Sequence, residues 1–112
     1  MLEALLQQIV TRPGVEGVVL SDSEGEPIYA LGHAGEDRLQ LLGAYQGILM
    51  STVARMLETE GRTLITICDT GSILTHHLKD GYFISVILSP ELHYAEAEFY
   101  FQDLYPSLIK EL

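Results

Sequence analysis

The chain has 112 residues, of which 47% are hydrophobic and 20% are charged. This composition predicts one globular domain, residues 1–112, and argues against a disordered chain. The formal net charge of −10 argues against nucleic acid as a partner, because an acidic surface repels phosphate, and it favours a basic or neutral protein surface instead.

The first residues, Met1 to Leu6, contain neither a basic leader nor a long apolar run, so no signal peptide is predicted. No stretch approaches the roughly 20 apolar residues that span a bilayer. We therefore expect no direct membrane insertion and a cytoplasmic location. Cys68 is the only cysteine in the sequence. It allows no internal disulfide, and its place in a strand pattern predicts a core residue.

The first half of the chain predicts a helix, two strands and a longer helix. Residues 2–12 carry apolar residues at helical spacing, and Pro13-Gly14 ends that helix. Strands are expected over residues 15–21 and 27–31, joined by a turn whose Asp, Ser and Gly suit local hydrogen bonds and a positive φ. Residues 36–60 form a long helical pattern, and Gly61 is its expected C-cap.

The second half predicts three strands and a closing helix. The strands are expected over residues 62–68, 72–78 and 82–88, with Asp- and Gly-containing turns between them. Ser89 is the expected N-cap of a helix that runs to about residue 105, before Pro106. The order α-β-β-α-β-β-β-α predicts an α/β (α+β) fold, with helices on the faces of a five-stranded, mostly antiparallel sheet.

The long helix has more apolar surface than one sheet can cover. At 100° per residue its polar positions, such as Asp37, Ser51 and Arg55, gather on one side, and the apolar arc spans roughly 240°. A surface helix usually shows an arc of about 100°. Such a helix needs two covers. One can be the sheet of the same chain, and we predict that the other is a second chain.

Residues 13–28, PGVEGVVLSDSEGEPI, follow the short first helix and place Gly, Asp and Pro at set spacings around the first hairpin. With this segment, the long helix, the three-strand meander and the closing helix, the whole chain resembles the Roadblock / dynein light chain family. It is similar in particular to the short prokaryotic members that accompany gliding-motility GTPases. The resemblance implies the strand order 2-1-5-4-3, with the long helix on one face and the terminal helices on the other.

The same resemblance implies a homodimer, in which the long helices pack together and the third strands pair edge to edge. It also implies a function: binding or regulating a small Ras-like GTPase, or serving as a subunit of a motor or signalling assembly. It supplies no catalytic residues, and no cofactor or metal is predicted.

Two features of the residues bear on the dimer. Gly43 and Gly47 each cost about 1 kcal/mol relative to alanine within a helix, which a close approach of either the chain's own sheet or a partner helix would explain. Strand 62–68 is apolar with little charge, and at an exposed edge it would invite pairing with another chain. The alternative is a strand covered from both sides. The candidate dimer interface comprises Leu42, Gly43, Gln46, Gly47, Met50, Ala54, Arg62, Leu64, Thr66 and Cys68.

Several patterns suggest chemistry but lack the spacing for it. His76 and His77 are adjacent in a strand and should point to opposite faces, so no shared metal is expected. Asp22, Glu24 and Glu26 alternate as calcium ligands do, but the sixth and twelfth EF-hand positions hold neither Gly nor Glu, which favours a solvated turn. Neither a phosphate-binding loop nor a nucleophile elbow is present in the sequence, so we do not expect an enzyme.

The predicted function is therefore a homodimeric adaptor that binds and regulates a small Ras-like GTPase, as an activator or a platform. Two alternatives stay open: a structural subunit without GTPase regulation, and a small-molecule sensor-like module. Large residues on the last strand, such as Tyr82 and Phe83, favour a filled interior over a ligand cavity. In the last helix Phe99 and Phe101 cannot point the same way, so part of its aromatic surface should be exposed or covered by a partner.

Overall fold

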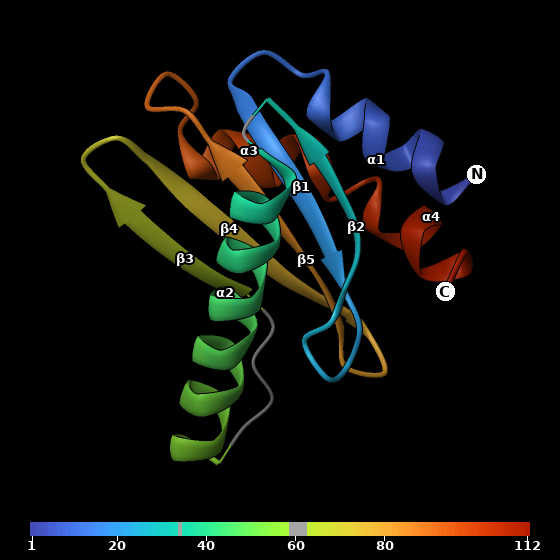
Figure 1. The fold of residues 1–112 in the computed structure, drawn as a ribbon, viewed down its shortest axis with the longest axis vertical. Coiled ribbons are helices and arrows are strands. Elements are labelled where there is room, and N and C mark those ends of the chain that lie inside the picture. Colours follow the sequence, from blue (N-terminus) through green and yellow to red (C-terminus); the bar gives the residue numbers. More distant parts are fainter. Residues whose placement is uncertain (34, 59–62) are drawn as a thin grey trace.

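The computed structural model describes residues 1–33, 35–58 and 63–112, which form five strands and four helices (Figure 1). In chain order these are α1 (Leu2–Val10), β1 (Val15–Ser21), β2 (Pro27–Gly32), α2 (Glu36–Met56), β3 (Thr63–Cys68), β4 (Gly71–Lys79), β5 (Tyr82–Leu88), α3 (Tyr94–Phe101) and α4 (Tyr105–Lys110). The strands form one antiparallel sheet in the order β2-β1-β5-β4-β3. The expected strand order is confirmed, and β2 and β3 are the two edges.

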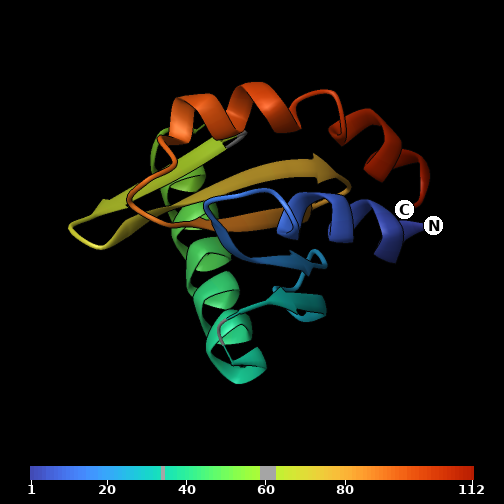
Figure 2. The same cartoon turned by 90° about the horizontal axis from the view of Figure 1, so that it is seen from above.

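The helices cover the sheet from both sides (Figures 1 and 2). The main core lies between the sheet and α1, α3 and α4, and includes Leu6, Val18, Ile84, Phe101 and Leu108. On the other face α2 crosses β1, β2 and β5, and Val19, Leu39 and Met50 are buried there. The interior strand β1, between β2 and β5, is therefore apolar on both faces, as a strand covered from both sides requires. The predicted placement of the long helix opposite the terminal helices is confirmed.

The first helix and the first turn end on local hydrogen bonds. α1 stops two residues earlier than expected, at Val10, and the hydroxyl of its C-cap Thr11 donates to the carbonyl oxygen of Gln7 (2.8 Å). In the β1–β2 turn Asp22 Oδ1 accepts from the backbone N–H groups of Glu24 and Glu26, both at 2.9 Å. The acidic alternation is therefore a turn bonded to its own backbone, as expected.

The long helix is shorter than its sequence pattern. It ends at Met56, with Leu57 as the C-cap and Glu58 at φ 52°. An L-residue in this left-handed region cannot continue a right-handed helix. The expected C-cap Gly61 and the expected strand residue Arg62 lie outside the described residues.

The prediction that Ser89 caps the last helix is wrong. Residues 89–92 form a turn in which Leu92 N–H donates to the carbonyl oxygen of Ser89 (3.2 Å). Helix α3 begins at Tyr94, and Nδ1 of its N-cap residue His93 accepts from the N–H of Ala95 (3.1 Å). Histidine is not a preferred N-cap residue, whereas serine is, so the pattern favoured the wrong position. After Phe101 the helix breaks, and Pro106 stands in the first turn of the separate helix α4, where a missing N–H costs little.

Candidate interaction surface

The side of α2 that faces away from the sheet is apolar. Six of its large side chains are between 43% and 78% exposed: Leu41, Tyr45, Ile48, Leu49, Val53 and Met56. Their spacing places them on one stripe of the helix. Thr52 falls within the stripe, but its hydroxyl donates to the carbonyl oxygen of Ile48 (2.7 Å). The stripe therefore matches the second apolar face that the sequence predicted.

The stripe faces away from the sheet and reaches both flanks of α2. Leu42, next to the stripe, shares an open cleft of about 330 Å³ with Cys68 and Ile73 of the β3–β4 hairpin. On the other flank of the helix, Ile48 of the stripe lines a hollow against the β1–β2 turn, together with Ser51 and Arg55. Among the described residues no strand pairs with the outer side of β3. The stripe and this open edge form one region, which we call the α2–β3 surface.

A buried glutamine holds the two parts of the α2–β3 surface together. Gln46 Nε2 donates to Thr75 Oγ1 of β4 (3.1 Å), and its Oε1 accepts from the hydroxyl of Thr66 on β3 (2.9 Å). Thr75 in turn shares a hydrogen bond with Ser85 of β5 (2.9 Å). Buried side-chain amides are costly unless paired, so this chain of bonds fixes the helix against three strands. Sequence patterns gave no sign of the roles of Thr75 and Ser85.

The two helix glycines face the chain's own sheet, which is one of the two close approaches that the sequence allowed for them. A Cβ atom at Gly43 would lie 2.8 Å from Val19 Cγ1, and one at Gly47 would overlap the ring of Phe83. The expectation of a tight contact is confirmed, but the neighbour is the sheet. Gln46 and Met50 are likewise buried within the chain, so the stripe replaces these four positions as the surface that a partner can reach.

The other candidate positions have different surroundings. Leu42, Ala54, Leu64 and Thr66 are partly buried, Cys68 is exposed, and Arg62 lies outside the described residues. The expectation that Cys68 fills the core is wrong. The reason is topological: β3 is an edge strand that α2 covers only in part, so alternate residues on it remain open to solvent.

His76 and His77, on opposite faces of β4, and the aromatic residue Tyr105 serve packing and local hydrogen bonds. The His76 ring stacks on Tyr105 at 4.2 Å between centroids, and Nδ1 shares a hydrogen bond with the Thr63 hydroxyl (3.0 Å). His77 Nε2 instead accepts from the N–H of Gly81 (3.2 Å). Burial, and then the nearby Glu98 carboxylate, raise the pKa of the Tyr105 phenol. Among the described residues, no group of three His, Cys, Asp or Glu side chains could hold a metal ion.

The last helix divides its aromatic residues as expected. Phe101 is buried in the main core, whereas Phe99 is 68% exposed. The last strand is also packed as expected, with Phe83, Ile84 and Leu88 buried.

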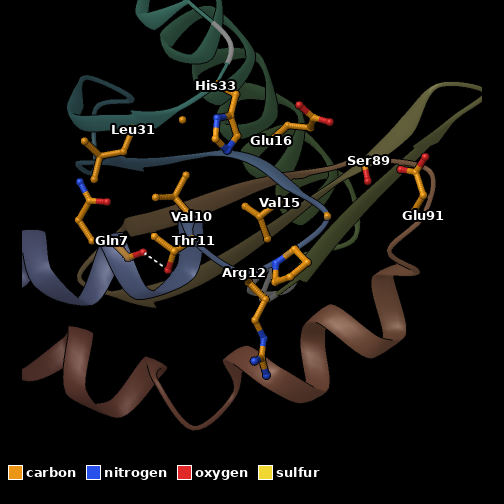
Figure 3. Close-up of a pocket in the computed structure, with 13 residues that line it drawn as sticks. Gln7, Val10, Thr11, Arg12, Val15, Glu16, Leu31, His33, Ser89 and Glu91 are labelled. Carbon is orange, nitrogen blue, oxygen red and sulfur yellow. Dashed lines mark hydrogen bonds between the residues drawn. The ribbon is translucent and has the colours of Figure 1, made fainter.

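A cleft of about 760 Å³ is an open hollow at the surface rather than a cavity in the core (Figure 3). It is lined by the end of α1, the start of β1, the end of β2 and the segment after β5. Among the residues that the structure describes, none of the helices combines the length and apolarity that a bilayer crossing needs.

No protein-family model matches the sequence, and no curated protein matches it. Solved structures do match. MglB from Myxococcus xanthus has a TM-score of 0.81 at 14% identity, over 97% of this chain and 92% of that chain. A Roadblock/LC7 domain from Streptomyces avermitilis has a TM-score of 0.77 at 18% identity, over 96% of this chain and 91% of that one. MglB in a tetrameric arrangement has a TM-score of 0.78 at 11% identity, over 97% of this chain and 85% of that chain. The chain therefore has the Roadblock/LC7 fold, as the sequence resemblance implied.

Proposed function

We propose that this chain forms a homodimer through the α2–β3 surface, and that the dimer is a cytoplasmic adaptor that binds and regulates a small Ras-like GTPase. The observation that carries the proposal is the α2–β3 surface itself. It joins an exposed apolar helix face to an open strand edge in a chain with the fold of MglB. Monomeric soluble proteins rarely leave so large a continuous apolar patch uncovered.

The magnitudes favour self-association. Fully burying a large apolar side chain contributes about 1.5–3 kcal/mol, and two protomers would each bring six such side chains. Association costs roughly 4–15 kcal/mol in lost translational and rotational freedom, and each ordered side chain adds about 0.5–1.5 kcal/mol. Burial of most of both stripes is of the size needed to offset that cost. A two-fold axis would also pair β3 with its copy, which satisfies both edges and stops further growth there.

The GTPase part of the proposal is supported by the fold and by charge. The chain shares its fold with gliding proteins of the MglB type, and its net charge of −10 suits a partner with a neutral or basic surface. We assign no catalytic group to this chain. Any effect on hydrolysis would come from arranging the GTPase's own groups.

The test is co-purification with candidate Ras-like GTPases loaded with GDP or with a non-hydrolysable GTP analogue. We expect the wild-type chain to retain a GTPase more strongly in one nucleotide state. Ile48→Arg, on the stripe, should weaken retention together with dimerisation. Phe99→Arg is the matched control, because Phe99 is similarly exposed (68% against 61%) but lies on α3.

A dimeric chain that retains no GTPase in either state would sink the regulator proposal. Retention that is equal in both states would instead favour a structural subunit without GTPase regulation.

A further inference from the structure

The strand β2 is the second edge of the sheet, and its outward backbone groups can be identified. His33 N–H donates to the carbonyl oxygen of Glu16 (2.8 Å), which makes residues 33 and 16 a hydrogen-bonded pair of the antiparallel ladder. In an antiparallel ladder, hydrogen-bonded pairs alternate with pairs that are not hydrogen-bonded. Along β2, Leu31 with Val18 is therefore a bonded pair, whereas Gly32 with Gly17 and Ala30 with Val19 are not. The N–H and C=O groups of Ala30 and Gly32 therefore point away from β1. No strand pairs with that side among the described residues.

This edge lacks most of the features that protect natural edge strands. Its sequence, PIYALG over residues 27–32, contains no charged side chain. Lysine or another charge in the strand is a common protection against pairing, as is proline. Here Pro27 stands only at the start, next to a register shift opposite Leu20 and Ser21. Residues 29–32 are left as an uncharged template for another strand.

Acidic side chains flank both ends of the edge. Glu24 and Glu26 are exposed just before β2. At the other end, Leu31 and Gly32 border the 760 Å³ cleft, which is also lined by Glu16 and Glu91 (Figure 3).

The charges in that cleft favour a cation. Ser89 Oγ is buried and makes no well-aligned hydrogen bond among the described residues. The Ser89 hydroxyl, and then the backbone N–H of Glu91, lower the pKa of the Glu91 carboxyl. Arg12 also lines the cleft, but its guanidinium lies over the Tyr100 ring at 3.8 Å from the centroid and points toward the C-terminal helices (Figure 3). The Arg12 guanidinium is therefore engaged with Tyr100, and the lining of the cleft also includes the carboxylate residues Glu16 and Glu91.

We propose that the β2 edge binds an extended peptide segment of a partner protein as an added strand, with a basic side chain of that segment in the cleft beside Glu16 and Glu91. Backbone hydrogen bonds would supply affinity, and the acidic ends would select the sequence. The site is independent of the dimer, which uses the opposite edge β3, so a dimer would carry two such sites.

The test is a titration of the ¹⁵N-labelled full chain, followed by NMR, with three synthetic peptides. The first alternates threonine and valine and has lysine at both ends. The second has glutamate at both ends, and the third is the lysine peptide with N-methyl groups on alternate residues. We expect the lysine peptide to shift the amide signals of Ala30 and Gly32. The glutamate and N-methylated peptides should bind at least tenfold more weakly.

Charge variants test the cleft. Glu16→Lys and Glu91→Lys should each weaken binding of the lysine peptide at least threefold. Asp103→Lys, in the α3–α4 connection, should leave that binding unchanged. The proposal is overturned if the three peptides bind equally, if none binds at millimolar concentration, or if the shifts map to Thr63–Cys68. None of these outcomes bears on GTPase retention, so the two proposals fail separately.

Discussion

Gln46 shows how much of this surface depends on single side chains. Helical spacing places it near the stripe, and the sequence therefore gave it to the dimer interface. In the structure it is 3% exposed, and its amide bonds Thr66 and Thr75. This amide joins the helix that carries the stripe to β3 and β4.

Replacing Gln46 by leucine should lower the free energy of unfolding by about 1–3 kcal/mol, because it leaves buried hydroxyl groups with fewer partners. Urea unfolding followed by circular dichroism measures the change. Gln102→Leu is the control, since Gln102 is exposed at the end of α3. Equal stability of the two variants would show that the buried network contributes little.

Tyr105 should make the chain sensitive to alkali. Burial, and then the Glu98 carboxylate, raise its pKa above the ordinary value of 10.0, so the fold favours the neutral phenol. The resulting stability is present below about pH 10 and is lost as the pH rises from there toward the folded-state pKa. Unfolding free energies measured from neutral pH upward should fall beyond pH 10 in the wild type and less steeply in Tyr105→Phe. Parallel curves would contradict this assignment.

The elements differ in how far the sequence could predict them. Strands and turns were predicted within a residue or two, because apolar alternation and Asp-Gly turns act locally. The start of α3 was not predicted, because its N-cap is His93 and histidine is not a preferred N-cap residue. For α2 the sequence predicted one wide apolar arc that needs two covers. It did not predict which part of that arc faces the sheet, because the close contacts of Gly43 and Gly47 depend on the positions of Val19 and Phe83, which tertiary packing sets.

The N-cap of α3 gives a prediction at this scale. His93→Ala should destabilise the chain by about 0.5–2 kcal/mol through loss of the cap, and His93→Asp should restore most of it, because aspartate is a favoured N-cap residue. Thermal unfolding at neutral pH compares the three chains. If His93→Asp is no better than alanine, the side chain acts through its stacking on Tyr94 and not as a cap.

At the scale of the molecule, the sheet has two open edges and the long helix has one uncovered face. From the sequence we predicted that the long helix has two apolar faces to bury, because helical periodicity shows which positions of a helix are apolar. The strand order that the resemblance implied already placed β2 at an edge. The sequence did not predict that acidic side chains from β1 and from the segment after β5 lie near that edge, because the fold sets those neighbours. The two edges have different surroundings: β3 adjoins the apolar stripe, and β2 lies between acidic groups.

Self-association through the α2–β3 surface is the central claim, and sedimentation equilibrium tests it most directly. At micromolar concentration the wild-type chain should sediment at twice its 12.4 kDa mass. Ile48→Arg should sediment as a folded monomer, and Phe99→Arg should remain a dimer. A wild-type monomer under these conditions, or a dimer that Ile48→Arg leaves unchanged, would contradict the account.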